Sequence, residues 1–283
     1  MTKIIIIICS ILLISPALAT NKLNLITYNV FGLPFPLKLK DKKRFKLIAR
    51  SLNAISSDIV ALQETFSKHS KSLAKLENFP YLAYGNPPKK FQFIDSGLIT
   101  LSKHPISRVK RLVFKACTGF DCFSRKGALL TTIKVPHIGE VDIYNTHLNA
   151  GKSKKVKYIQ LKQLYKFIEK YSANRPAVIL GDFNITPDSD FYTYLMDSLP
   201  LNESYFEYAK QNSSIDQNGY TYIKRSLIKK KIKSNRKLDY IFYLYSSGQY
   251  IYPEYSKVIY DGSHDENQYS DHFGVQTQLI IEN

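Results

Sequence analysis

The chain has no apolar run long enough to cross a bilayer, no Gly/Ser-rich or Pro-rich linker and no internal repeat. Because a spanning helix needs about 20 predominantly apolar residues, a helical membrane protein is excluded. The missing linkers and repeats argue against a string of small modules. After removal of a leader, about 260 residues remain, which suits one large α/β domain with a sizeable core.

The N-terminus carries the pattern of a secretory signal peptide. Lys3 precedes an apolar run from Ile4 to Ile14, and the small-residue segment Ser15 to Ala19 follows it. This pattern predicts cleavage after Ala19. We therefore expect residues 1–19 to be a signal peptide, residues 20–283 to form a single domain, and the mature protein to be soluble and secreted.

Cysteine is scarce, with three in the whole chain. Cys9 would leave with the signal peptide, so only Cys117 and Cys122 would remain. In an oxidising compartment a disulfide between them is the favoured interpretation. Two free thiols are the alternative, since a gap of four residues can be geometrically strained.

Acidic residues are outnumbered, with 23 Asp and Glu against 40 Lys and Arg, a formal net charge of +17. Loss of Lys3 lowers this to +16. Such an excess favours polyanions or anionic membrane surfaces, and charge alone does not distinguish nucleic acid from lipid. Basic residues crowd Lys224 to Lys237, which suits either a solvated loop or edge hairpin, or a basic arm that meets a membrane or nucleic acid.

Five short polar blocks close apolar, strand-like runs. In order along the chain they are Leu25 to Asn29, Ile59 to Glu64, Tyr144 to His147, Val178 to Asn184, and Ser270 to His272, the last preceded by Leu238 to Phe242. Buried strands appear as continuous aliphatic runs, and polar groups at their ends can converge on one cleft. Carboxylates, amides and two histidines together suit a hard divalent cation with histidine acid/base chemistry, which favours phosphate ester hydrolysis.

Three residues are candidate metal ligands. Glu64 ends a run that is otherwise core, and a buried carboxylate needs a cation or a strong partner. Asn29 offers a carbonyl oxygen to the same ion or an amide to phosphate, although an asparagine at this position also suits a turn. Asp271 is a second carboxylate, adjacent to His272.

The remaining candidates would carry the acid/base chemistry. His272 is the expected general base because imidazole titrates near neutral pH, and Asp239 is its expected orienting partner. His147 would donate a hydrogen bond to phosphate or protonate the leaving oxygen. Asp182 and Asn184 flank Phe183, so in an extended segment both would face one cleft, while the alternative is a simple turn.

Strands and helices alternate between these blocks. Apolar residues at helical spacing predict amphipathic helices around Phe45 to Ile55 and Tyr158 to Ile168. Segments 97–101, 128–133 and 141–144 have the character of strands, the last two without a helix between them. This mixture predicts two packed, mixed β-sheets flanked by helices.

With these motifs the chain resembles the endonuclease/exonuclease/phosphatase superfamily, and within it most closely the magnesium-dependent neutral sphingomyelinases. The narrower similarity is carried by Asn29 to Pro34, Ser96 to Leu98, Leu101 to Ile106, and Ser124 to Leu129. The resemblance implies a four-layer α/β sandwich of the DNase-I-like type. It implies Mg²⁺, or another divalent cation, bound by Glu64 with Asn29 and Asp271 nearby. It further implies phosphate contacts from Asn184 and His147, substrate binding by Lys126, Asp182 close to the attacking water or the leaving group, and His272 as a base held by Asp239.

The function expected from this resemblance is a secreted phosphodiesterase that hydrolyses sphingomyelin to ceramide and phosphocholine. Its partner would be a sphingomyelin or phospholipid surface, and we expect a monomer. A secreted DNase-like endonuclease, with nucleic acid as its partner, is the alternative. A catalytically inactive binding protein is disfavoured, because no core acid or histidine is missing. Secreted bacterial sphingomyelinases resemble one another in an aromatic membrane hairpin that often carries tryptophan, and this chain has no tryptophan. The basic stretch and the tyrosines between Tyr240 and Tyr260 are alternative membrane contacts.

Overall fold

The computed structural model describes residues 21–34, 41–90, 92, 94–225, 232–245, 248–262 and 269–282. The expected signal peptide and the lysines at positions 229–231 lie outside the described residues. Among the described residues no helix is long and apolar enough to cross a membrane.

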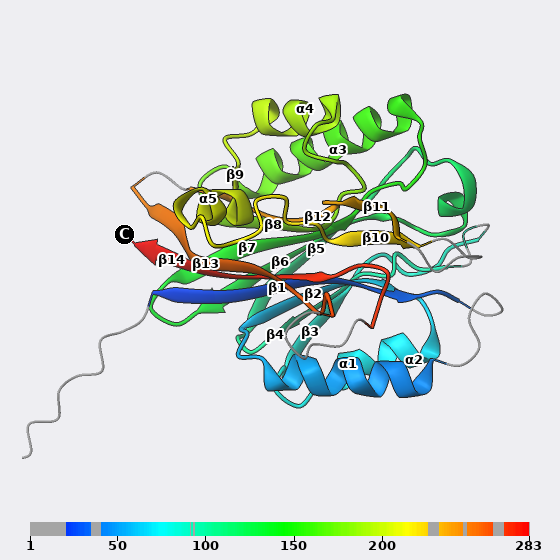
Figure 1. Ribbon diagram of the computed structural model, residues 1–283, viewed down its shortest axis with the longest axis horizontal. Coiled ribbons are helices and arrows are strands. Elements are labelled where there is room, and N and C mark those ends of the chain that lie inside the picture. The colour runs from blue at the N-terminus through cyan, green and yellow to red at the C-terminus, as the bar shows by residue number, and fades with distance from the viewer. Residues whose placement is uncertain are drawn as a thin grey trace, which may run out of the picture.

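Two six-stranded sheets form the centre of the molecule (Figure 1). The first runs in the order β13 (Tyr250–Ile259), β14 (Gly274–Glu282), β1 (Lys22–Gly32), β2 (Ile59–Thr65), β4 (Ile99–Ser102) and β3 (Tyr81–Tyr84). The second runs in the order β5 (Ile106–Val113), β6 (Gly127–Val135), β7 (Gly139–His147), β8 (Ala177–Asp182), β12 (Asp239–Leu244) and β9 (Asn202–Glu203). A separate ribbon pairs β10 (Tyr222–Arg225) with β11 (Ile232–Arg236).

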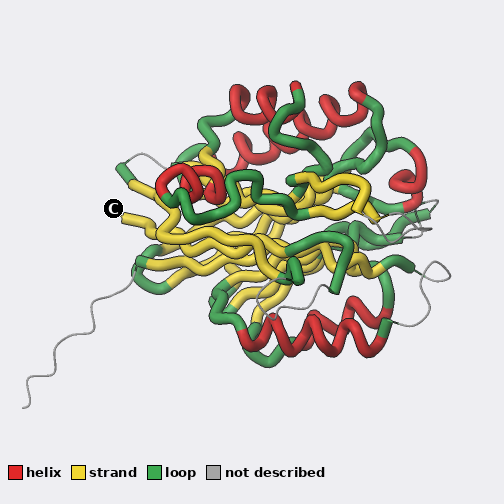
Figure 2. The backbone as a smooth tube through the Cα atoms, in the orientation of Figure 1, coloured by secondary structure: helices red, strands yellow, loops and turns green. Residues whose placement is uncertain are grey.

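Helices cover the outer faces of both sheets. In the view of Figures 1 and 2, α1 (Lys42–Ala54) and α2 (Lys68–Lys71) lie below the first sheet, whereas α3 (Lys154–Ser172) and α4 (Asp190–Ser198) lie above the second. The remaining helical elements are α5 (Ser204–Gln211) and the 3₁₀ turns η1 (Ser72–Lys75) and η2 (Gly119–Phe123). The expected four-layer sandwich of mixed sheets is therefore confirmed.

Three apolar layers explain why the strands have such continuous apolar sequences. In β1, Leu23 and Leu25 point between the sheets, whereas Ile26 and Tyr28 point towards α1. Because successive strand residues face opposite sides, a strand covered on both faces shows no polar alternation. A third layer packs α3 and α4 against the outer face of the second sheet.

The helices follow the periodicity of the sequence. Helix α1 buries Phe45, Ile48 and Leu52 at spacings of three and four residues. Helix α3 begins four residues before the expected Tyr158, because the Ser153 side chain accepts a hydrogen bond from Val156 N and caps the first turn.

Strand directions gather the polar blocks at one edge of the sandwich. Strands β1 and β2 are parallel, as are β7 and β8, so the ends that carry Asn29, Glu64, His147 and Asp182 lie on the same side. Strand β12 is antiparallel to β8, which puts its first residue, Asp239, opposite Asp182. The topology thus explains why blocks that are far apart in sequence converge.

Candidate active site

Asn29 bridges two carboxylates that come from different sheets. Its Nδ2 donates to Glu64 Oε1 at 3.1 Å and to Asp182 Oδ2 at 3.0 Å. Its Oδ1 accepts a hydrogen bond from Phe31 N at 3.0 Å. The NH₂ group therefore faces the two carboxylates, while the carbonyl that is expected to bind metal also holds the irregular end of β1, where the register with β2 shifts between Asn29 and Gly32.

Glu64 combines the features expected of a metal ligand. Its side chain is 16% exposed, and its Oε2 has no hydrogen-bond partner among the described residues. Burial raises the pKa of this carboxyl to about 7, even though the charges of Lys126 and His272 lower it. Its backbone has φ of 55°, in the left-handed region that non-glycine residues rarely adopt. A buried carboxylate oxygen without a partner is costly, and an oxygen-preferring divalent cation would satisfy it.

A second cluster couples a histidine to two aspartates. His272 Nδ1 donates to Asp239 Oδ2 at 2.8 Å, and His272 Nε2 lies 3.7 Å from Asp182 Oδ2. Burial lowers the pKa of His272, but the carboxylates of Asp239 and Asp182 outweigh burial and raise the pKa to about 10. Asp239 is fully buried, and its backbone N–H donates to Thr221 Oγ1 at 3.0 Å. The expected contact between His272 and Asp239 is therefore present, and the role of His272 as a general base stays a prediction.

His147 lies against a lysine at the centre of the site. Lys126 Nζ donates to His147 Nε2 at 2.9 Å and to Leu148 O at 3.1 Å, and forms an ion pair with Asp121 Oδ1 at 2.8 Å. Burial, together with the positive charge of Lys126, holds the pKa of His147 well below its usual range. His147 is therefore a neutral ring at physiological pH, and Lys126 supplies the positive charge beside it. His147 Nε2 is also 3.3 Å from Asp182 Oδ2, which joins the two clusters.

Two groups of metal-ligand type are present among the described residues, and both contain Asp182. One consists of Glu64, His147 and Asp182, the other of Asp182, Asp239 and His272. Burial also raises the pKa of Asp182. The arrangement presents a compact, largely buried set of acids and imidazoles with room for a cation.

Asp271 belongs to neither group. Its Oδ1 accepts a hydrogen bond from Ser270 Oγ at 3.3 Å, and its charge raises the pKa of Glu64 and His272. It therefore lies within electrostatic reach of the site, and its role as a metal ligand stays a prediction.

Asn184 lies next to the site in a turn and not in an extended strand. Strand β8 ends at Asp182 instead of extending through Asn184, and Asn184 has φ of 51°. Its N–H donates to Asp182 Oδ1 at 2.9 Å, and its Nδ2 donates to Leu148 O at 3.2 Å. The turn interpretation is right and the extended one is wrong, because the Asp182 side chain closes the turn itself.

Two charged residues of the site were not found from the sequence. Asp121 pairs with Lys126 and accepts from Ala150 N at 2.7 Å. Lys157 is buried on α3 and donates to Asn149 O and Asn184 O, both at 2.7 Å, and burial lowers its pKa to about 8. Neither residue follows an apolar run, so the signal that found the others was absent.

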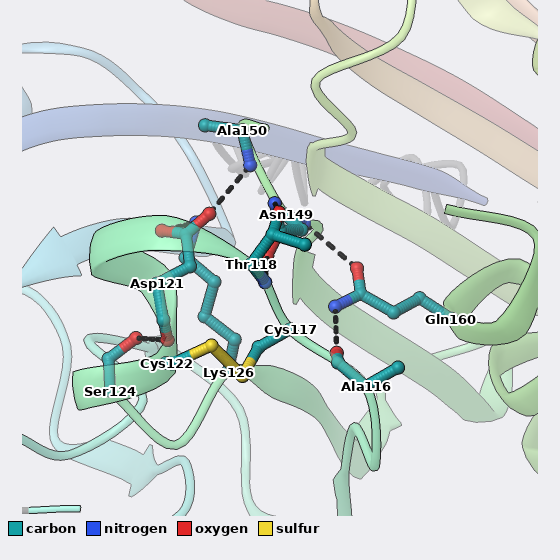
Figure 3. The surroundings of a disulfide bond; sticks show 10 residues. All are labelled: Ala116, Cys117, Thr118, Asp121, Cys122, Ser124, Lys126, Asn149, Ala150 and Gln160. Carbon is teal, nitrogen blue, oxygen red and sulfur yellow. Dashed lines mark hydrogen bonds and ion pairs between the residues drawn. A yellow bond between two sulfur atoms is a disulfide. The ribbon is translucent and has the colours of Figure 1, made fainter. Parts of the chain in front are cut away.

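The loop that carries Asp121 is closed by the Cys117–Cys122 disulfide, which confirms the expected pairing. Figure 3 shows Asp121 beside Ala150, and Gln160 linking Asn149 to Ala116. Thr118 N donates to Asn149 Oδ1 at 2.9 Å, so the loop is also tied to the segment after β7. The disulfide loop, residues 117–122, is thus fixed next to Lys126.

Fold and site together define a two-sheet α/β sandwich with an acid- and histidine-lined centre at one edge. Residues 26–272 match the model of the Endonuclease/Exonuclease/phosphatase family, and the chain belongs to that family.

Several individual relatives and solved structures are similar to this chain. A sphingomyelinase of Mycobacterium tuberculosis is 33% identical over 174 residues, covering 59% of this chain and 35% of the relative. Sphingomyelin phosphodiesterase 2 of Homo sapiens is 25% identical, covering 81% of this chain and 57% of the relative. A crystal structure of a beta toxin mutant from Staphylococcus aureus with bound magnesium ions aligns with a TM-score of 0.66 at 22% identity, covering 90% of this chain and 99% of that one. The chain spans about a third of the mycobacterial relative and somewhat over half of the human one.

Proposed function

We propose that this chain is an exported, divalent-metal-dependent phosphodiesterase that hydrolyses sphingomyelin to ceramide and phosphocholine. The observation that carries the proposal is the Glu64 carboxylate, whose buried Oε2 has no hydrogen-bond partner in the described part of the chain, together with the nearby Asp239–His272 pair. The similarity to proteins named sphingomyelinase supports the choice of substrate. The N-terminal sequence pattern and the disulfide support export.

The donor set fits a hard cation, and Mg²⁺ is the proposed one, in keeping with the magnesium ions in the beta toxin structure. Glu64 would hold it, with Asn29 and Asp271 close by. When bound, a divalent cation would stabilise negative charge on the phosphate oxygens and offset the charge of the neighbouring carboxylates.

His272 would act as the general base. Its Nε2 is the ring nitrogen that would take a proton from the attacking water, and a bound cation would have to offset the carboxylates that raise the pKa of His272 to about 10. Asp239 holds Nδ1 and so keeps Nε2 directed at the site. Asp182, 3.7 Å from His272 Nε2, is positioned to orient that water.

The phosphate would lie against Lys126 and His147. The ammonium group of Lys126 supplies positive charge for the developing oxyanion. His147, kept neutral by burial and by Lys126, accepts a hydrogen bond from Lys126 Nζ and would hold that ammonium group against the phosphate. Asn184, fixed by the turn after β8, would add an amide contact to the phosphate.

The substrate surface would be a membrane that contains sphingomyelin. Two features support this: the net charge of +17 and the lysines between Lys224 and Lys237. Nucleic acid becomes the partner only under the nuclease alternative.

One assay tests the function directly. Purified protein with Mg²⁺ is incubated side by side with sphingomyelin, phosphatidylcholine, plasmid DNA and an inositol phosphate, and each reaction is repeated with chelator and with Glu64→Gln. We expect phosphocholine release from sphingomyelin that chelator and the substitution both abolish. Magnesium-dependent plasmid nicking without phosphocholine release would replace this proposal with the nuclease.

A further inference from the structure

Two phenylalanines project from the disulfide loop region into solvent. Phe120 is 89% exposed and Phe123 is 53% exposed, and both belong to the short turn η2. A single exposed apolar side chain is ordinary in a soluble protein, whereas adjacent large ones on one rigid turn indicate a contact surface.

This turn is held rigidly. The Cys117–Cys122 disulfide closes it, Asp121 accepts from Ala150 N, and Ser124 Oγ donates to Asp121 O at 3.0 Å (Figure 3). Phe123 O accepts a hydrogen bond from Ile94 N at 3.2 Å. Because these contacts constrain the backbone of the turn, Phe120 is exposed as part of the folded structure and not because its loop is loosely attached.

The same phenylalanines line a pocket that also contains residues of the candidate active site. The pocket has a volume of about 170 Å³, and its apolar lining comes from Leu33, Pro34, Phe66, Ile94, Phe120 and Phe123. Its polar lining comes from Glu64, Asp121, Ser124, Lys126 and His147. An apolar cavity of roughly 150 Å³ accommodates a molecule the size of benzene, so a short hydrocarbon segment fits here.

An amphiphilic ligand matches this mixed lining. Lys126 suits a phosphate, and the apolar side chains suit hydrocarbon that begins within a few bonds of it. A nucleotide places a polar sugar at that distance, whereas a phospholipid places the start of its hydrocarbon chains there. The pocket therefore selects an amphiphile.

We propose that the disulfide loop inserts Phe120 and Phe123 into the lipid surface, and that the adjoining pocket holds the first hydrocarbon segment of the lipid whose phosphate is cleaved. The choice of a phospholipid as substrate rests on the proposed function, but contact between the loop and lipid can be measured without turnover. Phe120 and Phe123 would thus form the membrane contact in a chain that has no tryptophan.

The absence of native tryptophan allows a direct test. Phe120→Trp introduces a single fluorescent reporter, which is titrated with vesicles of sphingomyelin and phosphatidylcholine in chelator. We expect a blue shift of emission, and quenching by lipids brominated in their acyl chains. Tyr81→Trp is the matched control, because Tyr81 is 40% exposed on β3, lines no part of this pocket and lies outside the tyrosines between Tyr240 and Tyr260. An unshifted Phe120→Trp spectrum with vesicle-bound protein, or failure of the wild-type protein to sediment with vesicles, overturns the inference.

A second measurement quantifies the contact. Phe120→Ser and Phe123→Ser should each weaken vesicle binding about ten- to hundredfold, the equivalent of withholding one phenylalanine from an apolar environment. Tyr81→Ser should bind and hydrolyse as the wild type does. Equal losses in all three variants, or none in the two phenylalanine variants, would refute a specific insertion.

The two proposals fail in distinguishable ways. A blue shift without hydrolysis of sphingomyelin leaves the lipid contact standing and removes the proposed activity. Hydrolysis of sphingomyelin without a blue shift leaves the activity standing and removes the loop from the membrane contact.

Discussion

Glu64 should make the metal-free protein less stable as pH rises. Its carboxyl has a pKa of about 7 in the folded protein against an ordinary value of 4.5, mainly because of burial. Between these two values the folded state keeps the proton that the unfolded chain has lost. The folded state binds more protons there, so stability falls with increasing pH. One pKa unit corresponds to about 1.4 kcal/mol, and the full effect is therefore about 3 kcal/mol.

The measurement is urea unfolding in chelator at about pH 4 and about pH 8, for the wild type and for Glu64→Gln. The substituted protein retains every other titrating group, so the difference between the two proteins isolates Glu64. We expect the wild type to lose about 3 kcal/mol more than Glu64→Gln between the two pH values. Addition of Mg²⁺ at the higher pH should then stabilise the wild type by about 2.7 kcal/mol at a hundredfold excess over its dissociation constant, and Glu64→Gln far less. Parallel pH dependence in the two proteins, or equal stabilisation by Mg²⁺, would refute the assignment of Glu64.

Three further outcomes follow from other parts of the structure. His272→Ala should reduce turnover by roughly two to four orders of magnitude, and Asp239→Asn by less; unchanged pH–rate profiles in both would remove His272 as the base. Reduction of the disulfide should lower the free energy of unfolding by about 2 kcal/mol, and alkylation of both thiols without reductant would contradict the link. Lys237 Nζ is buried 3.5 Å from Glu203 Oε1 and lies 4.3 Å from the ring centroid of Tyr205 and 4.9 Å from that of Phe206. Glu203→Gln should cost about 3 kcal/mol in denaturant unfolding, because it leaves this ammonium group without its counter-charge; a change within experimental error would show that the ring contacts suffice.

Hydrophobic pattern was enough to predict the buried strands and the two long helices. Strands β1, β2, β7 and β8 are covered on both faces, so their sequences are apolar throughout and their ends are conspicuous. The contrast between these apolar strands and the polar residues at their ends also identified the site residues. Strand β5 was missed because it is only partly buried and carries arginines and a lysine among its apolar residues.

Site residues that do not follow an apolar strand could not be predicted from the hydrophobic pattern. Asp121 lies on a disulfide-closed turn and Lys157 lies on a helix, and no periodicity distinguishes either residue from its neighbours. Lys126 was named only through the resemblance to known sphingomyelinases. For Asn184 the pattern allows both an extended segment and a turn, and the structure has the turn, because β8 ends at Asp182 and the Asp182 side chain accepts from Asn184 N.

The site draws on both sheets, so its geometry depends on how the sheets are held together. Asn29 and Glu64 belong to the first sheet, whereas His147 and Asp182 belong to the second, and apolar packing between the sheets is not directional. Buried hydrogen bonds between the two sheets fix the position of one sheet relative to the other. Gln63 Nε2 donates to Asn145 Oδ1 at 2.9 Å, and Asn145 Nδ2 donates to Leu62 O and Ile99 O in the first sheet. These bonds tolerate little sliding, because a displaced amide would leave buried partners unpaired. The polar residues next to the acidic cluster therefore set the spacing between the carboxylates of Glu64 and Asp182.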